Sequence, residues 1–93
     1  MFVVIFRAQI KALDAEYNAT AQTLRELALA EYGCHEFISF TEGNEEVALS
    51  WWDSLEQIKA WKNNAAHKAA QEKGRRDWYE SVSVQVLESV KQY

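Results

Sequence analysis

The chain has 93 residues, which is enough for one domain and too few for two. Its net charge of −4 argues against the basic surface that binding to nucleic acid phosphates requires. Hydrophobic residues make up 48% of the chain and include four tryptophans, more than the core of so small a domain needs. We expect the surplus apolar side chains to pack against a partner or to line a ligand pocket.

A single cysteine, Cys34, excludes an intrachain disulfide, and nothing in the sequence argues for an oxidising compartment. The apolar residues 1–6 are followed by Arg7, so this run is too short for the hydrophobic part of a secretion signal or for a membrane span. We expect one cytoplasmic domain over residues 1–93 that binds neither membranes nor nucleic acid.

The first half of the chain predicts a strand, a helix and a hairpin. Phe2–Phe6 is β-branched and aromatic, which is typical of a strand. From Leu13 to Tyr32, apolar residues recur at three- and four-residue spacing, which predicts a helix that ends at Gly33. His35–Thr41 and Val47–Trp52 then read as two strands joined by a tight turn.

The second half predicts two helical segments and a last strand. Ser54 and Gln57 have the spacing of a capping box, which predicts that a helix carrying Trp61 begins there. Asn63-Asn64 is expected to break this helix, and an alanine-rich helix then runs over Ala65–Lys73 and ends at Gly74. Ser81–Val90 alternates valine with polar residues, as a strand does.

The resulting order, β-α-β-β-α-β, predicts an α+β fold of the ferredoxin-like type, with both helical segments on one face of an antiparallel sheet. Both faces of the first and third strands are apolar, since Val3 and Ile5 alternate with Phe2, Val4 and Phe6. Two helices cannot cover both faces of a sheet. We therefore expect a homodimer in which the open sheet face packs against the same face of a second copy. The alternative is a monomer with an exposed apolar face.

No common catalytic or phosphate-binding motif is present, and the two histidines have no metal-site spacing, so no metal is expected. His67 follows Trp61 by six residues, and an unbroken helix would place the two on different faces. They can share a pocket only if the chain bends between them. His67 is then either a pocket donor, acceptor or haem ligand, or a surface or capping residue.

The tryptophans are candidates both for the core and for the wall of a slot that takes a flat aromatic ligand. Trp52 and Trp78 are the two we add to Trp61 as candidate binding residues. Arg7 ends an apolar strand, and its side chain either reaches such a slot or is a charge at the surface.

The chain resembles the antibiotic biosynthesis monooxygenase family of the dimeric α+β barrel superfamily over nearly its whole length. The resemblance lies in four segments: Phe2–Arg7, Ser50–Lys62, His67–Arg75 and Trp78–Ser81. It implies a dimeric barrel and, more weakly, the oxygenation of a small aromatic or quinone-like molecule without metal, flavin or nicotinamide. In that chemistry an electron-rich phenol is deprotonated and the anion passes an electron directly to O₂.

The resemblance also implies roles for individual residues. Characterised members place an Asn one turn before a pocket Trp and a Tyr or His after it, which makes Trp61 and His67 the candidate catalytic residues and puts Gln57 at the Asn position. Haem-degrading relatives use an Asn on the first strand, near where Arg7 stands here, together with a Trp and a haem-ligating His. Haem binding or degradation is therefore the alternative, and a non-catalytic small-molecule-binding dimer or a purely structural dimer are two more.

Overall fold

The computed structural model describes all residues, Met1–Tyr93. None of its helices is long and apolar enough to cross a membrane. The elements in chain order are β1 (Phe2–Ile10), α1 (Tyr17–Glu31), β2 (Glu36–Glu42), β3 (Glu45–Trp52), α2 (Leu55–Lys62), α3 (Ala65–Lys73), the π-helical turn η1 (Gly74–Trp78) and β4 (Tyr79–Glu88).

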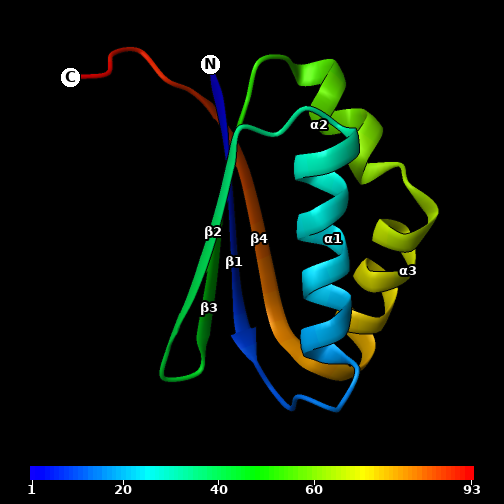
Figure 1. Ribbon diagram of the computed structural model, residues 1–93. Helices are drawn as coiled ribbons and strands as arrows, with labels where there is room; N and C mark the ends of the chain where they lie inside the picture. The colour runs from blue at the N-terminus through cyan, green and yellow to red at the C-terminus, as the bar shows by residue number, and fades with distance from the viewer.

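The four strands form one sheet in the order β2-β3-β1-β4, and every neighbouring pair is antiparallel. The two central strands, β1 and β3, are the most apolar ones, as expected for strands flanked on both sides. All helices lie on one side of this sheet (Figure 1). The predicted α+β, ferredoxin-like fold is confirmed.

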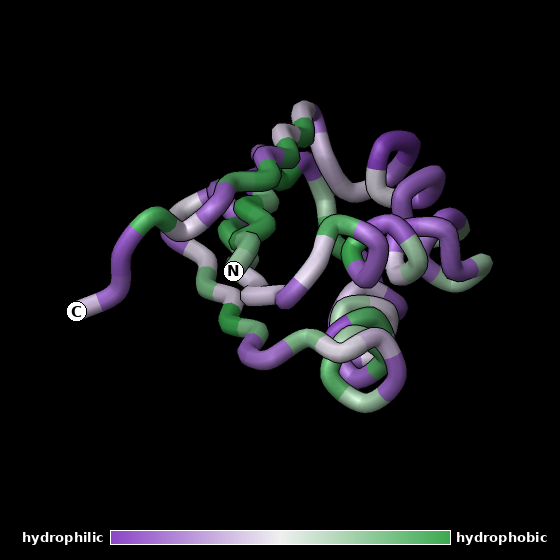
Figure 2. The backbone as a smooth tube through the Cα atoms, turned by 90° about the horizontal axis from the view of Figure 1, so that it is seen from above, coloured by the Kyte–Doolittle hydropathy of each residue, from purple (hydrophilic) through white to green (hydrophobic).

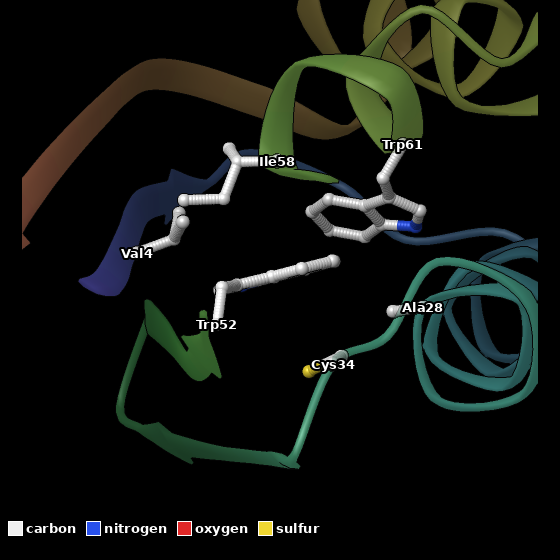
Figure 3. Close-up of a cluster of buried hydrophobic side chains, with 6 residues drawn as sticks. All are labelled: Val4, Ala28, Cys34, Trp52, Ile58 and Trp61. Atoms are coloured by element: carbon white, nitrogen blue, oxygen red, sulfur yellow. The ribbon is translucent and has the colours of Figure 1, made fainter. Parts of the chain in front are cut away.

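The core lies under α2, where the helix layer meets β1 and β3 (Figure 3). Trp52 from β3 is fully buried and Trp61 from α2 packs on it, with ring centroids 5.2 Å apart. Burial of two indoles supplies much of the apolar area that a domain of this size can remove from water. The six buried members of this cluster are Val4, Ala28, Cys34, Trp52, Ile58 and Trp61.

The face of the sheet that points away from the helices is also apolar. Residues directly opposite each other on paired strands share a face, and Leu49 lies opposite Ile5 on one side and Ile38 on the other. Figure 2, which looks along the strands, shows helices on one side of the sheet only. No part of this chain covers the other face, whose apolar residues are Val3, Ile5, Ile38, Phe40, Val47, Leu49, Trp51 and Leu87.

Several predicted boundaries are wrong: β1, for one, runs to Ile10 rather than ending at Phe6. The first helix begins at Tyr17 rather than Leu13, because the Asp14 carboxylate accepts a hydrogen bond from the Glu16 N–H (3.0 Å) and holds a turn there. α3 ends at Lys73 as predicted, but Gly74 keeps right-handed helical dihedrals, and the chain continues through η1 to Trp78. The last strand therefore starts directly afterwards, at Tyr79 rather than Ser81.

The capping box at the start of α2 is present as predicted. The Ser54 hydroxyl accepts from the Gln57 N–H (3.2 Å), and the Gln57 side-chain oxygen accepts from the Ser54 N–H (3.3 Å). The cap sets where α2 begins, and α2 carries Trp61 into the core.

We expect Ser54→Ala to lower the free energy of unfolding by about 1 kcal/mol, because the Gln57 N–H loses the hydroxyl that accepts its hydrogen bond. Chemical denaturation measures this, with Ser89→Ala, an exposed serine just after β4, as the matched control. Equal stability of the two variants would contradict a role for the cap.

Candidate functional site

A cavity of about 620 Å³ lies between the sheet and the helices. Its volume is in the range of small-molecule sites, and 14 of its 25 lining residues are hydrophobic. All four strands, all three helices and η1 contribute to the wall. The cavity is therefore formed by tertiary packing and not by any single motif.

The break between α2 and α3 shapes one end of this cavity. Asn63 ends α2, and the Asn64 side chain caps α3 by accepting from the Ala66 N–H (2.8 Å). The bend places the His67 ring edge to face against the Trp61 ring, with ring centroids 4.3 Å apart and an angle of 77° between the ring planes. The condition under which these two residues share a pocket is thus met, and both line the cavity.

Trp61 is fixed in place on three sides. Its indole N–H donates to the Leu24 carbonyl of α1 (3.1 Å), which ties α2 to α1. Its ring packs against Trp52 and, edge on, against Phe37 of β2 with centroids 6.0 Å apart. A ring held in this way is a rigid wall for a flat ligand and for His67.

His67 is a neutral imidazole at physiological pH. Burial disfavours its charged form, and the nearby Lys62 ammonium adds to this effect, so the pKa of His67 falls to about 4. Its Nδ1 is buried and has no hydrogen-bond partner in the protein. A buried polar atom without a partner is costly, so this nitrogen is available to a ligand that enters the cavity.

Trp78 is the third predicted site residue that lines the cavity. It is nearly fully buried at the end of η1, edge on to Tyr17 with centroids 5.1 Å apart. Its indole N–H makes no hydrogen bond of normal geometry, although its closeness to Asp14 lowers the pKa of that carboxyl group.

Trp52 and Gln57 do not line the cavity. Trp52 belongs to the core, and its indole N–H donates to the buried Ser50 hydroxyl (2.9 Å). The Gln57 side chain is held by the cap of α2 and lies against Gly33, where a Cβ would come within 2.5 Å of Gln57 Nε2. The structure therefore does not place the Gln57 side chain in the cavity, where it was predicted to bind a ligand.

Arg7 also lies outside the cavity. Its position in β1 puts it on the open face of the sheet, opposite Val47 and Ser83. There its guanidinium pairs with the Glu45 carboxylate, with Nε 2.7 Å from Oε1. In this structure Arg7 is a charge on the apolar face and does not reach Trp61 or His67.

Sequence reasoning missed four polar side chains that line the cavity. Tyr17 fits the apolar spacing of the first predicted helix, and Tyr79 precedes the predicted last strand, so neither residue stands out as polar. Ser50 and Glu46 alternate with Ala48 on the helix-facing side of β3. Two polar residues on the inner side of a central strand are a signal that could have marked a pocket.

No group of three or more His, Cys, Asp or Glu side chains comes together in a way that could hold a metal ion. The second histidine, His35, pairs at the surface with Asp53, with Nε2 2.8 Å from Oδ1. His67 is consequently the one imidazole at the cavity.

A family model described as "Antibiotic biosynthesis monooxygenase" matches residues 1–73. The chain belongs to this family. One relative is the uncharacterized protein YqjZ of Bacillus subtilis (strain 168), which is 36% identical to this chain over 86 residues. The match covers 91% of this chain and 75% of the relative.

Solved structures with the same fold have much lower sequence identity to this chain. Rv0793 of Mycobacterium tuberculosis matches with a TM-score of 0.84 at 17% identity, covering 98% of this chain and 96% of its own. SnoaB of Streptomyces nogalater, described as a cofactor-independent oxygenase, matches in its N63A mutant form with a TM-score of 0.80 at 11% identity. That match covers 98% of this chain and 94% of SnoaB. Likeness at such low identity shows that this family member shares their fold.

We expect the His67 imidazole to titrate near pH 4, which NMR of the two histidine rings would measure. Since this pKa lies below the value of 6.5 in the unfolded chain, His67 contributes stability above pH 6.5 that is lost as the pH falls toward 4. In His67→Phe, the loss of stability between pH 6.5 and 4 should be smaller. A midpoint near 6.5 in the folded protein would contradict the burial of this ring.

Proposed function

We propose that this chain is a cofactor-independent monooxygenase that acts on a small hydroquinone or quinone-like aromatic molecule. The observation that carries the proposal is the buried, unpartnered Nδ1 of a neutral His67 at the wall of an apolar cavity, held against Trp61. Membership of the antibiotic biosynthesis monooxygenase family supports an oxygenase-type reaction.

The chemistry asks little of the protein beyond binding and proton transfer. His67 Nδ1 accepts the proton of a ligand hydroxyl, and the imidazolium that forms stabilises the phenolate beside it. The anion passes an electron to O₂, and the two radicals combine to a ring-bound peroxide. This peroxide takes up the proton held by His67, and its O–O bond breaks as water leaves. For a hydroquinone the balance is hydroquinone plus O₂ giving hydroxyquinone plus water, so the substrate supplies all four electrons and no other reductant is needed.

The apolar walls serve this reaction in two ways. A flat ring fits against Trp61, which fixes its orientation relative to His67. The low dielectric of the cavity strengthens the attraction between the phenolate and the imidazolium. When the cavity holds no anion, the pKa of His67 is about 4 and the imidazole is unprotonated; a phenolate beside it raises that pKa and so lets His67 hold the proton.

We expect oxygen uptake with at least one member of a hydroquinone panel, measured with an oxygen electrode. His67→Ala should lower kcat/KM by roughly 10²–10⁴-fold, the usual contribution of a positioned general base. His35→Ala removes the other histidine, at the surface, and should leave the rate unchanged. A rate that is the same with and without His67 would contradict the proposal.

Two of the three alternatives, a non-catalytic binding dimer and a haem-binding protein, give different results in the same samples. Saturable binding of panel members without oxygen uptake would favour a non-catalytic binding module. Haem added to the protein tests the other alternative: a Soret shift that is present in wild type and His35→Ala and lost in His67→Ala would favour haem binding by the imidazole at the cavity.

We also propose that two copies pair through the open face of the sheet. The exposed fraction of Phe40 there is 53% and that of Leu87 is 46%, on a face that no helix covers. Apolar patches of this extent are rarely left open to water, and sheets pack well face to face. A second copy brings an identical apolar face, with the Arg7–Glu45 pair on each subunit.

We expect light scattering after size exclusion to give twice the 10.8 kDa mass of one chain. Leu49→Lys places a charge in the middle of the open face and should shift the protein to the monomer mass. Leu13→Lys, at an exposed leucine just before α1, is the control and should not. A wild-type monomer at micromolar concentration would overturn the pairing.

A further inference from the structure

Two tyrosine hydroxyls meet at the end of the cavity remote from His67. Tyr17 is the first residue of α1 and Tyr79 the first of β4, and both line the cavity. The Tyr79 hydroxyl donates to the Tyr17 hydroxyl over 3.2 Å. The Glu46 carboxylate, also at the wall, is close enough to raise the pKa of both tyrosines, for which burial is the larger cause.

The register of the sheet separates this pair from His67. His67 packs on Trp61, Trp61 packs on Phe37, and Phe37 lies opposite Ser50 on β3. Glu46 lies four residues from Ser50 on the same strand, which is about 13 Å. The cavity is therefore elongated along the strands, with an imidazole at one end and the hydroxyl pair at the other.

The hydroxyl pair has one hydrogen-bond donor left over. Of its two protons, the one on Tyr79 is shared with Tyr17, and no protein atom accepts the one on Tyr17. The Tyr17 side chain is nearly fully buried, and a buried donor without an acceptor is costly. An oxygen atom of a ligand in the cavity would accept this proton.

The charge at this end decides which kind of oxygen fits. Glu46 accepts a hydrogen bond from the Thr41 hydroxyl and is the carboxylate that faces the tyrosine pair. A second negative charge would be repelled there. A carbonyl or hydroxyl oxygen suits the site, and a carboxylate does not.

We propose that the Tyr17–Tyr79 hydroxyl pair is a second anchor, which binds a neutral carbonyl or hydroxyl oxygen at the end of the ligand remote from His67. This inference rests on the proposed binding of an aromatic ligand in the cavity. It adds that preferred ligands are elongated and carry oxygen at both ends, whereas the family match and the fold say nothing about these two residues.

The backbone around η1 is built to hold Tyr79 in this position. A Cβ added at the buried Gly74 would lie 2.9 Å from Tyr79 Cε2, so only glycine lets the ring pack so closely on the turn. The Phe6 ring meets the Tyr79 ring edge on, with centroids 5.7 Å apart. The hydroxyl is thus aimed by rigid contacts on both sides of the ring.

Two rod-shaped probes that differ by one hydroxyl test the anchor: 4,4′-biphenol and 4-phenylphenol, titrated calorimetrically under nitrogen so that no turnover occurs. Wild type should bind the biphenol roughly three- to tenfold more tightly, the usual effect of one hydrogen bond. In Tyr17→Phe this ratio should fall to about one, because the free donor is gone. Tyr32→Phe removes a hydroxyl that bonds Asn64 outside the cavity and is the control.

A wild-type ratio near one, or an unchanged ratio in Tyr17→Phe, would overturn the anchor. If Tyr17→Phe does not fold, wild type is titrated instead with 4-fluoro-4′-hydroxybiphenyl, whose fluorine is a poor hydrogen-bond acceptor, and an affinity equal to that for 4,4′-biphenol overturns the anchor. A ratio that behaves as expected in a protein without oxygen uptake would keep the anchor and reject the catalytic proposal. If neither probe binds, the anchor fails, whereas the catalytic proposal is still decided by oxygen uptake with the hydroquinone panel.

A third probe tests the charge argument. With 4′-hydroxybiphenyl-4-carboxylate, wild type should bind more weakly than with 4,4′-biphenol. Glu46→Gln should improve binding of the carboxylate by at least roughly threefold and leave 4-phenylphenol unaffected, because only the former brings a second negative charge to Glu46. Equal affinities in wild type and Glu46→Gln would contradict the role of this carboxylate.

Discussion

The packing of Trp61 on Trp52 is the contact on which the rest of the molecule depends. It fixes α2 over β3 at a ring separation of 5.2 Å, and the Trp61 N–H then ties α2 to the Leu24 carbonyl of α1. Because α3 follows α2 after a single bend, the position of His67 is set by the same contact. One pair of indoles thus orders the helix layer and one end of the cavity.

Space remains under the helices because the chain has few large side chains there to fill it. α3 has no buried residue, and its alanines are too short to reach the sheet. The helix-facing side of β4 is therefore exposed, with Val82 at 42%. A layer of large side chains would have produced a solid core, whereas alanines and a bent helix leave a cavity lined by a histidine and two tyrosines.

The two ends of this cavity differ in chemistry for a physical reason. At one end, His67 is buried among carbon atoms and near Lys62, so it is neutral and can accept a proton. At the other, Tyr17 and Tyr79 are buried near a carboxylate, so both stay protonated, and Tyr17 accepts from Tyr79 while its own proton is free to be donated. A ligand that bridges them gives up a proton at one end and accepts a hydrogen bond at the other.

Local sequence was enough to determine the order of strands and helices, the cap at Ser54, the break at Asn63-Asn64 and the apolar character of both sheet faces. Each of these depends on neighbours in the chain: period, capping chemistry or turn residues. The family resemblance, which the family match confirms, likewise rests on short runs of consecutive residues.

Tertiary structure alone decided which of the candidates reach the cavity. Trp52, Gln57 and Arg7 are as suitable in type as Trp61, but burial in the core, a helix cap and the opposite sheet face remove them from it. Tyr17 and Tyr79 are 62 residues apart and meet only because β4 returns beside β1 over the start of α1. Contacts between segments far apart in the sequence depend on how the sheet and the helix layer pack. No local sequence pattern encodes how these layers are placed.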